Sequence, residues 1–144
     1  MHPNRQRYHA RVSPSEPLRM PLVVEFEDVD AFGIVNHARL VTYLERARMR
    51  LIAQTGLVLL GPALPVVYDL RVRYQRPARL LDELVVLVWV VDVDDYQVWL
   101  KYEVRRGEER IVVAATTIAF ADRETGRLSP TPPEILALAR VEAR

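Results

Sequence analysis

A single long helical pattern, followed by strand patterns that succeed one another through short breaks, constrains the fold of this chain most. Residues 38–54 repeat apolar side chains at spacings of four and three, as an amphipathic helix does: Leu40, Leu44, Ala47 and Leu51. Gly56 then supplies a stop signal. Such a helix needs a partner surface for its apolar stripe, and only strands are available to provide a large one.

The strand patterns are of two kinds. Residues 22–26, 68–75 and 96–104 alternate apolar and polar side chains with a period of two. Residues 84–91 form an unbroken apolar run, as expected of a strand covered on both faces, and a turn at Arg106-Gly107 precedes the last apolar segment, 111–120. Short connections favour antiparallel pairing. We therefore expect an α+β fold in which one long helix lies across one antiparallel sheet.

The two ends of the chain differ in pattern. Residues 1–18 are polar and basic without an apolar stretch, so we interpret them as a flexible arm and not as a signal peptide. Residues 19–144 are expected to form one domain. Near its end, Thr131 can cap a short second helix, with Pro132 in the first turn and Glu134 three residues after the cap.

Composition excludes several classes of protein. The chain is 50% hydrophobic and 27% charged with a formal net charge of +1, an ordinary globular balance that does not suggest wholesale binding to nucleic acid or to an anionic membrane. No cysteine is present, which excludes disulfides, a thiolate nucleophile and cysteine-bound metal. No apolar run approaches the roughly 18 residues of a membrane-spanning helix. We expect a cytoplasmic protein.

Residues 27–37, between a strand and the main helix, combine carboxylates with a glycine, an asparagine and a histidine. Asn36 is a good cap for the helix, and the first N–H groups of that helix, from about His37 to Arg39, then lack intrahelical partners. They create a small region of positive potential that can hold a developing oxyanion. Asp30 could fold back to face it. A carboxylate beside oxyanion donors is the minimum apparatus for attack on a thioester or ester carbonyl.

Other interpretations of this segment are possible. Two aspartates before a helix are often solvated turn residues. A calcium loop also begins Asp-x-Asp, but here Phe32 and Arg39 stand where oxygen ligands belong. A transition-metal site from Asp28, Asp30 and His37 would lack further ligands, because the other histidines lie in the arm. We expect no metal, and no serine lies in a nucleophile motif.

The segments DVDAFGIVNHAR (28–39) and YLERAR (43–48) resemble the signature of the hotdog thioesterases. The 4-hydroxybenzoyl-CoA thioesterase family and the short-chain acyl-CoA thioesterases encoded near the bacterial Tol–Pal system are the most similar members. YQRPARLLDEL (74–84) resembles a second signature, in which a strand ends in Pro-Ala-Arg and the next begins after an acidic residue. The resemblance covers roughly residues 21–120.

This resemblance implies a fold and an activity. The fold is a five- or six-stranded antiparallel sheet wrapped around one long central helix, in homodimers with active sites at the interface that frequently pair into homotetramers. The activity is hydrolysis of an acyl-CoA thioester to the free acid and coenzyme A. No cofactor is implied, because coenzyme A is part of the substrate and product.

The resemblance also assigns roles to individual residues. Asp30 matches the catalytic aspartate, which acts as nucleophile or as general base for water. His37 matches the position whose backbone N–H polarises the thioester carbonyl, and in some members the histidine side chain also matters. Gly33 matches the glycine that lets the backbone approach the ligand. Asn36 stands where an aromatic is common. Glu45 matches a recurrent helix glutamate, which could simply pair with an arginine three residues on.

Coenzyme A carries several phosphates, so cationic side chains are expected at the mouth of the site. Bidentate arginines suit phosphate, and the candidates by spacing are Arg71, Arg73, Arg76 and Arg79. The alternative for each is a solvated strand face.

Other functions fit the same fold. A thioesterase acting on acyl-carrier protein would dock an acidic partner and show salt-sensitive kinetics. A hydratase would need a His–Asp pair on a hydration motif that this sequence does not show. A non-enzymatic acyl-CoA-binding domain would not need Asp30 to face a helix N-terminus, which favours the enzyme.

Overall fold

The computed structural model describes residues 16–142. Its elements in chain order are β1 (Leu18–Val23), a 3-10 turn η2 (Phe26–Asp28), α1 (His37–Gln54), β2 (Ala63–Tyr74), β3 (Glu83–Val93), β4 (Gln97–Arg106), β5 (Glu109–Asp122), β6 (Leu128–Ser129) and α2 (Pro133–Glu142). Among the described helices, none is long and apolar enough to cross a membrane.

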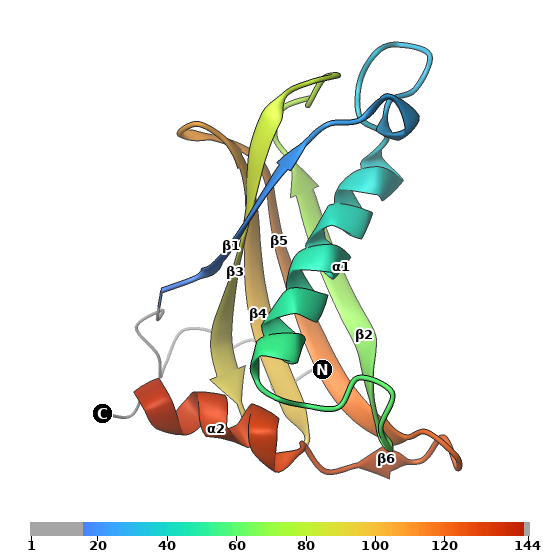
Figure 1. Ribbon diagram of the computed structural model, residues 1–144, viewed down its shortest axis with the longest axis vertical. Helices are drawn as coiled ribbons and strands as arrows, with labels where there is room; N and C mark the ends of the chain where they lie inside the picture. Colours follow the sequence, from blue (N-terminus) through green and yellow to red (C-terminus); the bar gives the residue numbers. More distant parts are fainter. Residues whose placement is uncertain (1–15, 143–144) are drawn as a thin grey trace, which may run out of the picture.

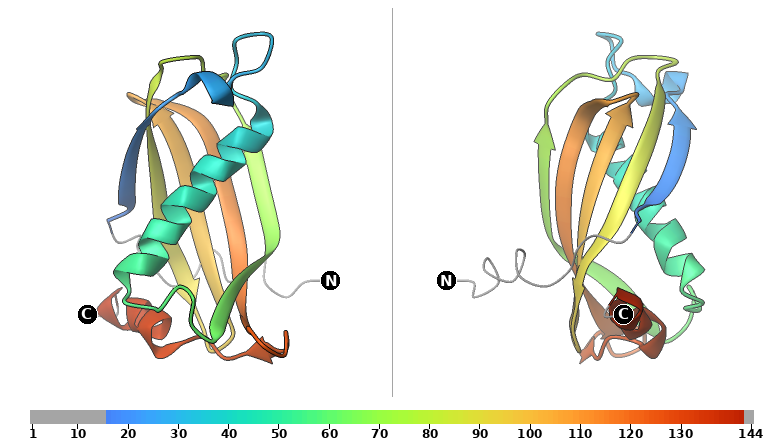
Figure 2. Two further views of the ribbon diagram at one scale, coloured as in Figure 1. Left: turned by 45° about the vertical axis from the view of Figure 1, so that its right-hand side comes forward. Right: turned by 90° about the vertical axis from the view of Figure 1, so that its left-hand side faces the viewer.

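The strands form one antiparallel six-stranded sheet in the order β1-β3-β4-β5-β2, with β6 paired to the end of β5. Helix α1 lies across one face of this sheet, and α2 lies at the end of the sheet that the C-terminal end of α1 reaches (Figures 1 and 2). The predicted architecture of one long helix on an antiparallel sheet is confirmed. Strands β1 and β2 are the two edges of the sheet.

The core lies between α1 and the facing side of the sheet. Helix α1 buries Leu40, Tyr43, Leu44, Ala47 and Ile52, and the sheet contributes Val86, Val88, Leu100, Tyr102 and Val104. Leu51 of the predicted stripe is only half-buried, whereas Ile52 is buried. Both Leu51 and Ile52 line a small apolar cavity together with Ile135 and Leu138 of α2.

Three predicted elements have wrong boundaries. The strand expected at 22–26 is β1, which spans Leu18–Val23 and ends there because Val23 pairs with Glu83, where β3 begins. The strand expected at 68–75 is β2, which begins five residues earlier, at Ala63. The expected cap of α2 at Thr131 is also wrong. The helix begins at Pro133, and the Pro132 carbonyl accepts the N–H groups of Ile135 and Leu136. Within residues 16–142 the buried Thr131 hydroxyl has no hydrogen-bond partner. Pro133 takes the first helical position, where its missing N–H costs nothing.

The expected arm, residues 1–18, lies outside the described residues except for its last three. Of these, Leu18 already belongs to β1 and pairs with Val88.

Candidate active site

The polar segment before α1 forms a closed loop, residues 28–36, which we call the site loop. Its ends are joined by the Asn36 N–H, which donates to the Asp28 carbonyl (3.0 Å), and by a β-bridge between Val29 and Val35. Gly33 has φ of +76° and donates its N–H to the Asp30 carbonyl (3.0 Å). A side chain at Gly33 would be strained in this left-handed conformation, so the tight turn explains the glycine.

Asp30 is held at the tip of this loop by backbone groups. Its Oδ1 accepts the N–H of Phe32 (2.8 Å) and of Ile34 (3.4 Å), and its own N–H donates to the Ile34 carbonyl (2.9 Å). Both hydrogen bonds that the carboxylate accepts within residues 16–142 go to Oδ1, so Oδ2 is available to water or substrate. The side chain is exposed. The loop therefore fixes one oxygen of the carboxylate and presents the other.

A cavity of about 410 Å³ lies between the site loop and the first turns of α1. Its lining residues are Glu27, Asp28, Val29, Asp30, Asn36, Ala38, Arg39 and Thr42. The cavity brings the Asp30 carboxylate together with the start of α1, as the sequence led us to expect, and gives room for a small acyl group or the reacting end of a longer molecule.

Asp28 has a different role from Asp30. It is buried, with 4% of its surface exposed, and its Oδ2 accepts the hydroxyl of Tyr43 (2.7 Å), while the Arg39 Nε lies 3.9 Å from Oδ1. Burial, and then the hydrogen bond to Asp28, raise the pKa of Tyr43 far above its usual range, so Tyr43 stays a protonated donor. Asp28 thus ties the site loop to α1. Sequence reasoning gave Tyr43 no role, because a tyrosine on an apolar stripe has the pattern of a core residue.

Asn36 caps α1 as predicted and also reduces the number of free N–H groups at the expected oxyanion site. Its Oδ1 accepts the N–H of Ala38 (2.8 Å), and its carbonyl accepts the N–H of Arg39 (2.9 Å). Three free N–H groups were expected from His37 to Arg39, but within residues 16–142 only that of His37 lacks a partner. One donor is left at the helix start, because Asn36 uses both of its oxygens.

His37 is not among the residues that line the cavity, and its side chain lies beside Tyr74 at the end of β2. Its ring meets that of Tyr74 edge-on at 6.2 Å between centroids, and the Tyr74 hydroxyl donates to the His37 carbonyl (3.1 Å). Burial raises the pKa of Tyr74. The imidazole of His37 thus faces Tyr74, while its backbone N–H is the one free donor at the start of α1 within residues 16–142.

The other helix candidate, Glu45, is exposed on the outer side of α1. Among the described residues it forms no ion pair with Arg48, which instead hydrogen-bonds the Tyr102 hydroxyl. Glu45 does not line the cavity.

The four candidate arginines divide into two pairs. Arg71 and Arg73 lie exposed along β2, and Arg71 is 3.8 Å from Asp69. Arg76 and Arg79 lie in the loop after β2, where Arg76 pairs with Glu109 (3.4 Å). The backbone of Arg79 forms a β-bridge with Ile34, so this arginine is next to the site loop.

No group of three or more histidine, aspartate or glutamate side chains within residues 16–142 is arranged to hold a metal ion. The groups that the structure places around the site loop are a carboxylate, a free backbone N–H and nearby guanidinium groups.

The chain is similar to known proteins in both sequence and fold. Residues 24–138 match the family described as the thioesterase-like superfamily. The chain is 41% identical over 71 residues to the acyl-CoA thioester hydrolase YbgC of Escherichia coli, a match that spans 46% of this chain and 52% of that protein. The chain thus matches about half the length of this curated relative.

Solved structures share the fold. A probable thioesterase from Bartonella henselae superposes with a TM-score of 0.74 at 24% identity, covering 82% of this chain and all (100%) of the other. A DHNA-CoA thioesterase from Staphylococcus aureus superposes with a TM-score of 0.80 at 20% identity, covering 88% and 91%. At these identities the likeness concerns the fold alone.

Proposed function

Because this chain belongs to the thioesterase-like superfamily, we propose that it hydrolyses an acyl-CoA thioester to the free acid and coenzyme A, with Asp30 as the catalytic carboxylate. The observation that carries the proposal is the placement of Asp30, whose Oδ1 is held by two backbone N–H groups and which lines a cavity at the start of α1. The acyl-CoA thioester hydrolase named among its relatives supports the substrate class.

In the first route Asp30 acts as a general base. Its carboxylate takes a proton from water, the water oxygen bonds to the acyl carbon, and the His37 N–H donates to the oxyanion that forms. The C–S bond then breaks, and the proton passes from Asp30 to the departing thiolate. In the second route Oδ2 itself attacks, the C–S bond breaks, and water hydrolyses the resulting anhydride. Both routes need the same held carboxylate.

The arginines beside the site are proposed to receive the phosphates of coenzyme A. Arg79 is the first candidate for phosphate binding, because its backbone pairs with the site loop at Ile34. Arg76, three residues before it, is the second. We extend the assignment to Arg71 and Arg73 farther along β2. Guanidinium groups bind phosphate with two parallel hydrogen bonds.

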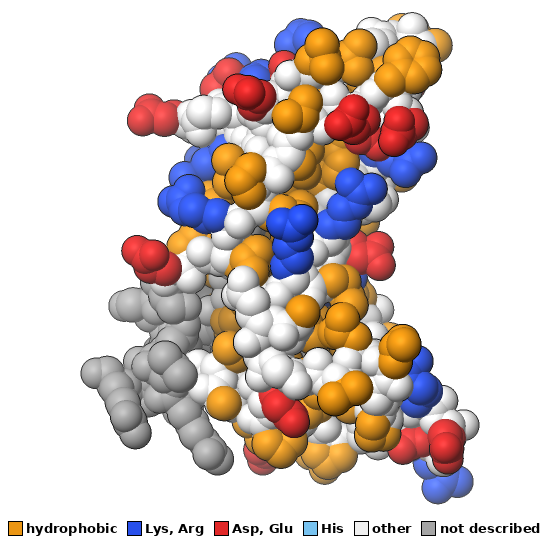
Figure 3. Space-filling model, viewed as in Figure 1, with side chains coloured by type: hydrophobic (Ala, Val, Ile, Leu, Met, Phe, Trp, Pro, Cys, Tyr) orange, Lys and Arg blue, Asp and Glu red, His pale blue; other side chains and the backbone are white. Residues whose placement is uncertain are grey.

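We also propose that the chain forms a homodimer on the edge of β2, paired into tetramers as the family resemblance implies. One side of β2 pairs with β5, and no described strand pairs with the other. Val66, Val67 and Leu70 of β2 are exposed. Hydrophobic side chains are visible at the surface on the β2 side of the face that carries α1 (Figure 3). An exposed apolar edge strand is a template for pairing with another chain.

The test is thiol release from short, long and aromatic acyl-CoAs by the wild type and by Asp30→Asn. We expect the substitution to lower kcat about 10²–10⁴-fold, as removal of a general base does, with an unchanged melting temperature. Near-normal turnover by the variant would remove Asp30 from the mechanism. If the wild type releases no thiol from any CoA ester, the same panel on acyl-carrier-protein thioesters distinguishes a carrier-protein thioesterase from a domain that only binds acyl-CoA.

A further inference from the structure

A second loop runs beside the site loop and supports it. This support loop, residues 75–82, joins β2 to β3. Its Ala78 carbonyl accepts the Val35 N–H (2.8 Å), and its Arg79 forms a β-bridge with Ile34. Ile34 also holds Asp30, since its carbonyl accepts the Asp30 N–H (2.9 Å). The position of the Asp30 turn therefore depends on where the support loop lies.

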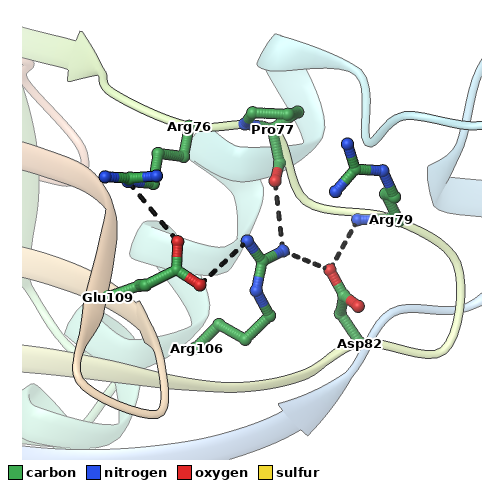
Figure 4. Close-up of polar contacts among 6 residues, drawn as sticks. All are labelled: Arg76, Pro77, Arg79, Asp82, Arg106 and Glu109. Atoms are coloured by element: carbon green, nitrogen blue, oxygen red, sulfur yellow. Dashed lines mark hydrogen bonds and ion pairs between the residues drawn. The ribbon is translucent and has the colours of Figure 1, made fainter.

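The support loop is itself held by one arginine at the end of β4. The Arg106 Nη1 donates to the Asp82 Oδ2 (2.6 Å) and to the Pro77 carbonyl (3.2 Å), so it ties both ends of the segment 77–82 (Figure 4). The same Asp82 oxygen accepts the Arg79 N–H (2.8 Å). Glu109 lies between the Arg106 Nη2 (3.5 Å) and the Arg76 Nε (3.4 Å), which extends the network to Arg76 (Figure 4).

The Arg106–Asp82 pair is partly shielded from water. Its side chains are 25% and 21% exposed. Burial alone would raise the pKa of Asp82, but the hydrogen bonds from the Arg79 N–H and the Arg106 side chain outweigh it and lower the pKa. The Asp82 hydrogen bond raises the pKa of Arg106. Both groups are thus charged at neutral pH, and removing one leaves the other as a poorly solvated charge.

The conformation of the support loop also shows that it needs outside restraint. Leu81 has φ of +67°, in the left-handed region, where a residue with a branched side chain is strained. Its N–H donates to the Val24 carbonyl (3.0 Å), next to the Asp82 contacts. A backbone in this state persists only where its surroundings fix it.

We propose that Arg106 and Asp82 are positioning residues for hydrolysis, which hold the support loop so that Ile34 keeps the Asp30 carboxylate in its reactive place. The proposal rests on the proposed function of Asp30. Neither side chain lines the cavity, so both act through the loop. The competing explanation is a brace that stabilises the fold without affecting the site.

The experiment compares Arg106→Met with Arg123→Met. Arg123 is a matched control, because its Nε and Nη2 donate to the carbonyls of Gly61 (2.7 Å) and Leu59 (3.1 Å) and so tether a different loop. Each variant is assayed for thiol release well below its melting temperature. We expect Arg106→Met to lower kcat about 10- to 100-fold, the cost of a misplacement of about 1 Å, and Arg123→Met to leave kcat unchanged. Arg106→Lys keeps the charge and should recover part of the loss.

A second measurement does not depend on activity. Amide hydrogen exchange at Asp30 and Val35, whose N–H groups bond Ile34 and Ala78, should accelerate in Arg106→Met and in the milder Asp82→Asn but not in Arg123→Met. Unchanged exchange at both amides, or an equal loss of kcat in the two methionine variants, would overturn the positioning role. An inactive wild type would overturn the proposed function, while the exchange data would still decide whether Arg106 holds the loop.

Discussion

The two ends of α1 lie in opposite surroundings. At the C-terminal end, Ile52 is sealed between the sheet and α2 in an apolar cavity lined by residues such as Phe120 and Ile135. At the N-terminal end, the helix start meets a cavity lined by carboxylates, an asparagine and an arginine. The two ends of α1 therefore differ in what they contribute. The last turns contribute to stability by burying apolar surface, whereas the first turn lies beside polar and charged groups.

The largest stability effect should come from the apolar end. Phe120→Ala removes a side chain that is 1% exposed, and we expect the free energy of unfolding to fall by about 3–5 kcal/mol, because a cavity remains in the core. Denaturant unfolding measures this loss. The kcat of the folded fraction should stay at the wild-type value. A large fall in kcat for the folded protein would show that the two ends of α1 are not independent.

A smaller and mixed effect is expected from the link between the site loop and α1. Tyr43→Phe leaves the buried Asp28 carboxylate without its 2.7 Å hydrogen bond, which should cost about 1–3 kcal/mol of unfolding free energy. Because this bond also anchors the site loop, kcat should fall as well. Thermal unfolding and thiol release on one preparation test both effects. If stability falls and turnover is unchanged, the Tyr43–Asp28 hydrogen bond stabilises the fold without positioning the site.

The smallest effect is a pH dependence of stability, which should appear for the support loop but not for the apolar end of α1. The pKa of Asp82 is lowered in the folded protein, so its ionised form stabilises the fold above the unfolded pKa of about 3.9, and this contribution is lost as pH falls through the lower, folded pKa. The loss of unfolding free energy caused by Asp82→Asn, measured by urea unfolding, should therefore be constant from neutral pH to about pH 5 and shrink below about pH 4. The loss caused by Phe120→Ala should not change with pH. Parallel curves for the two variants would contradict an ionised Asp82.

Local patterns explain which features could be predicted from the sequence. The period of residues 38–54 and the alternation in residues 68–75 depend on neighbours in the chain, and they place α1 to within one residue and the second half of β2. The Asn36 cap was predictable for the same reason. The end of β1 was not, because it depends on where β3 begins.

The supports of the site depend on distant partners. Arg106 and Asp82 are 24 positions apart, and Tyr43 and Asp28 are 15 apart. The spacing of charges along one chain cannot show that the end of β4 lies beside the loop after β2. The number of free N–H groups at the start of α1 was overestimated for a related reason, because the pattern reveals a cap but not that Asn36 accepts with both of its oxygens.

The single N–H left at the start of α1 also gives the site a direction. A helix start with several free donors can cradle the three oxygens of a phosphate, whereas one donor matches the one oxygen of a carbonyl. An extended thioester ligand with an anionic tail would then have one favourable orientation, with its carbonyl toward His37 and its phosphates toward the arginines of the support loop. On the proposed function, the Asn36 cap would therefore favour a carbonyl over a phosphate at the start of α1.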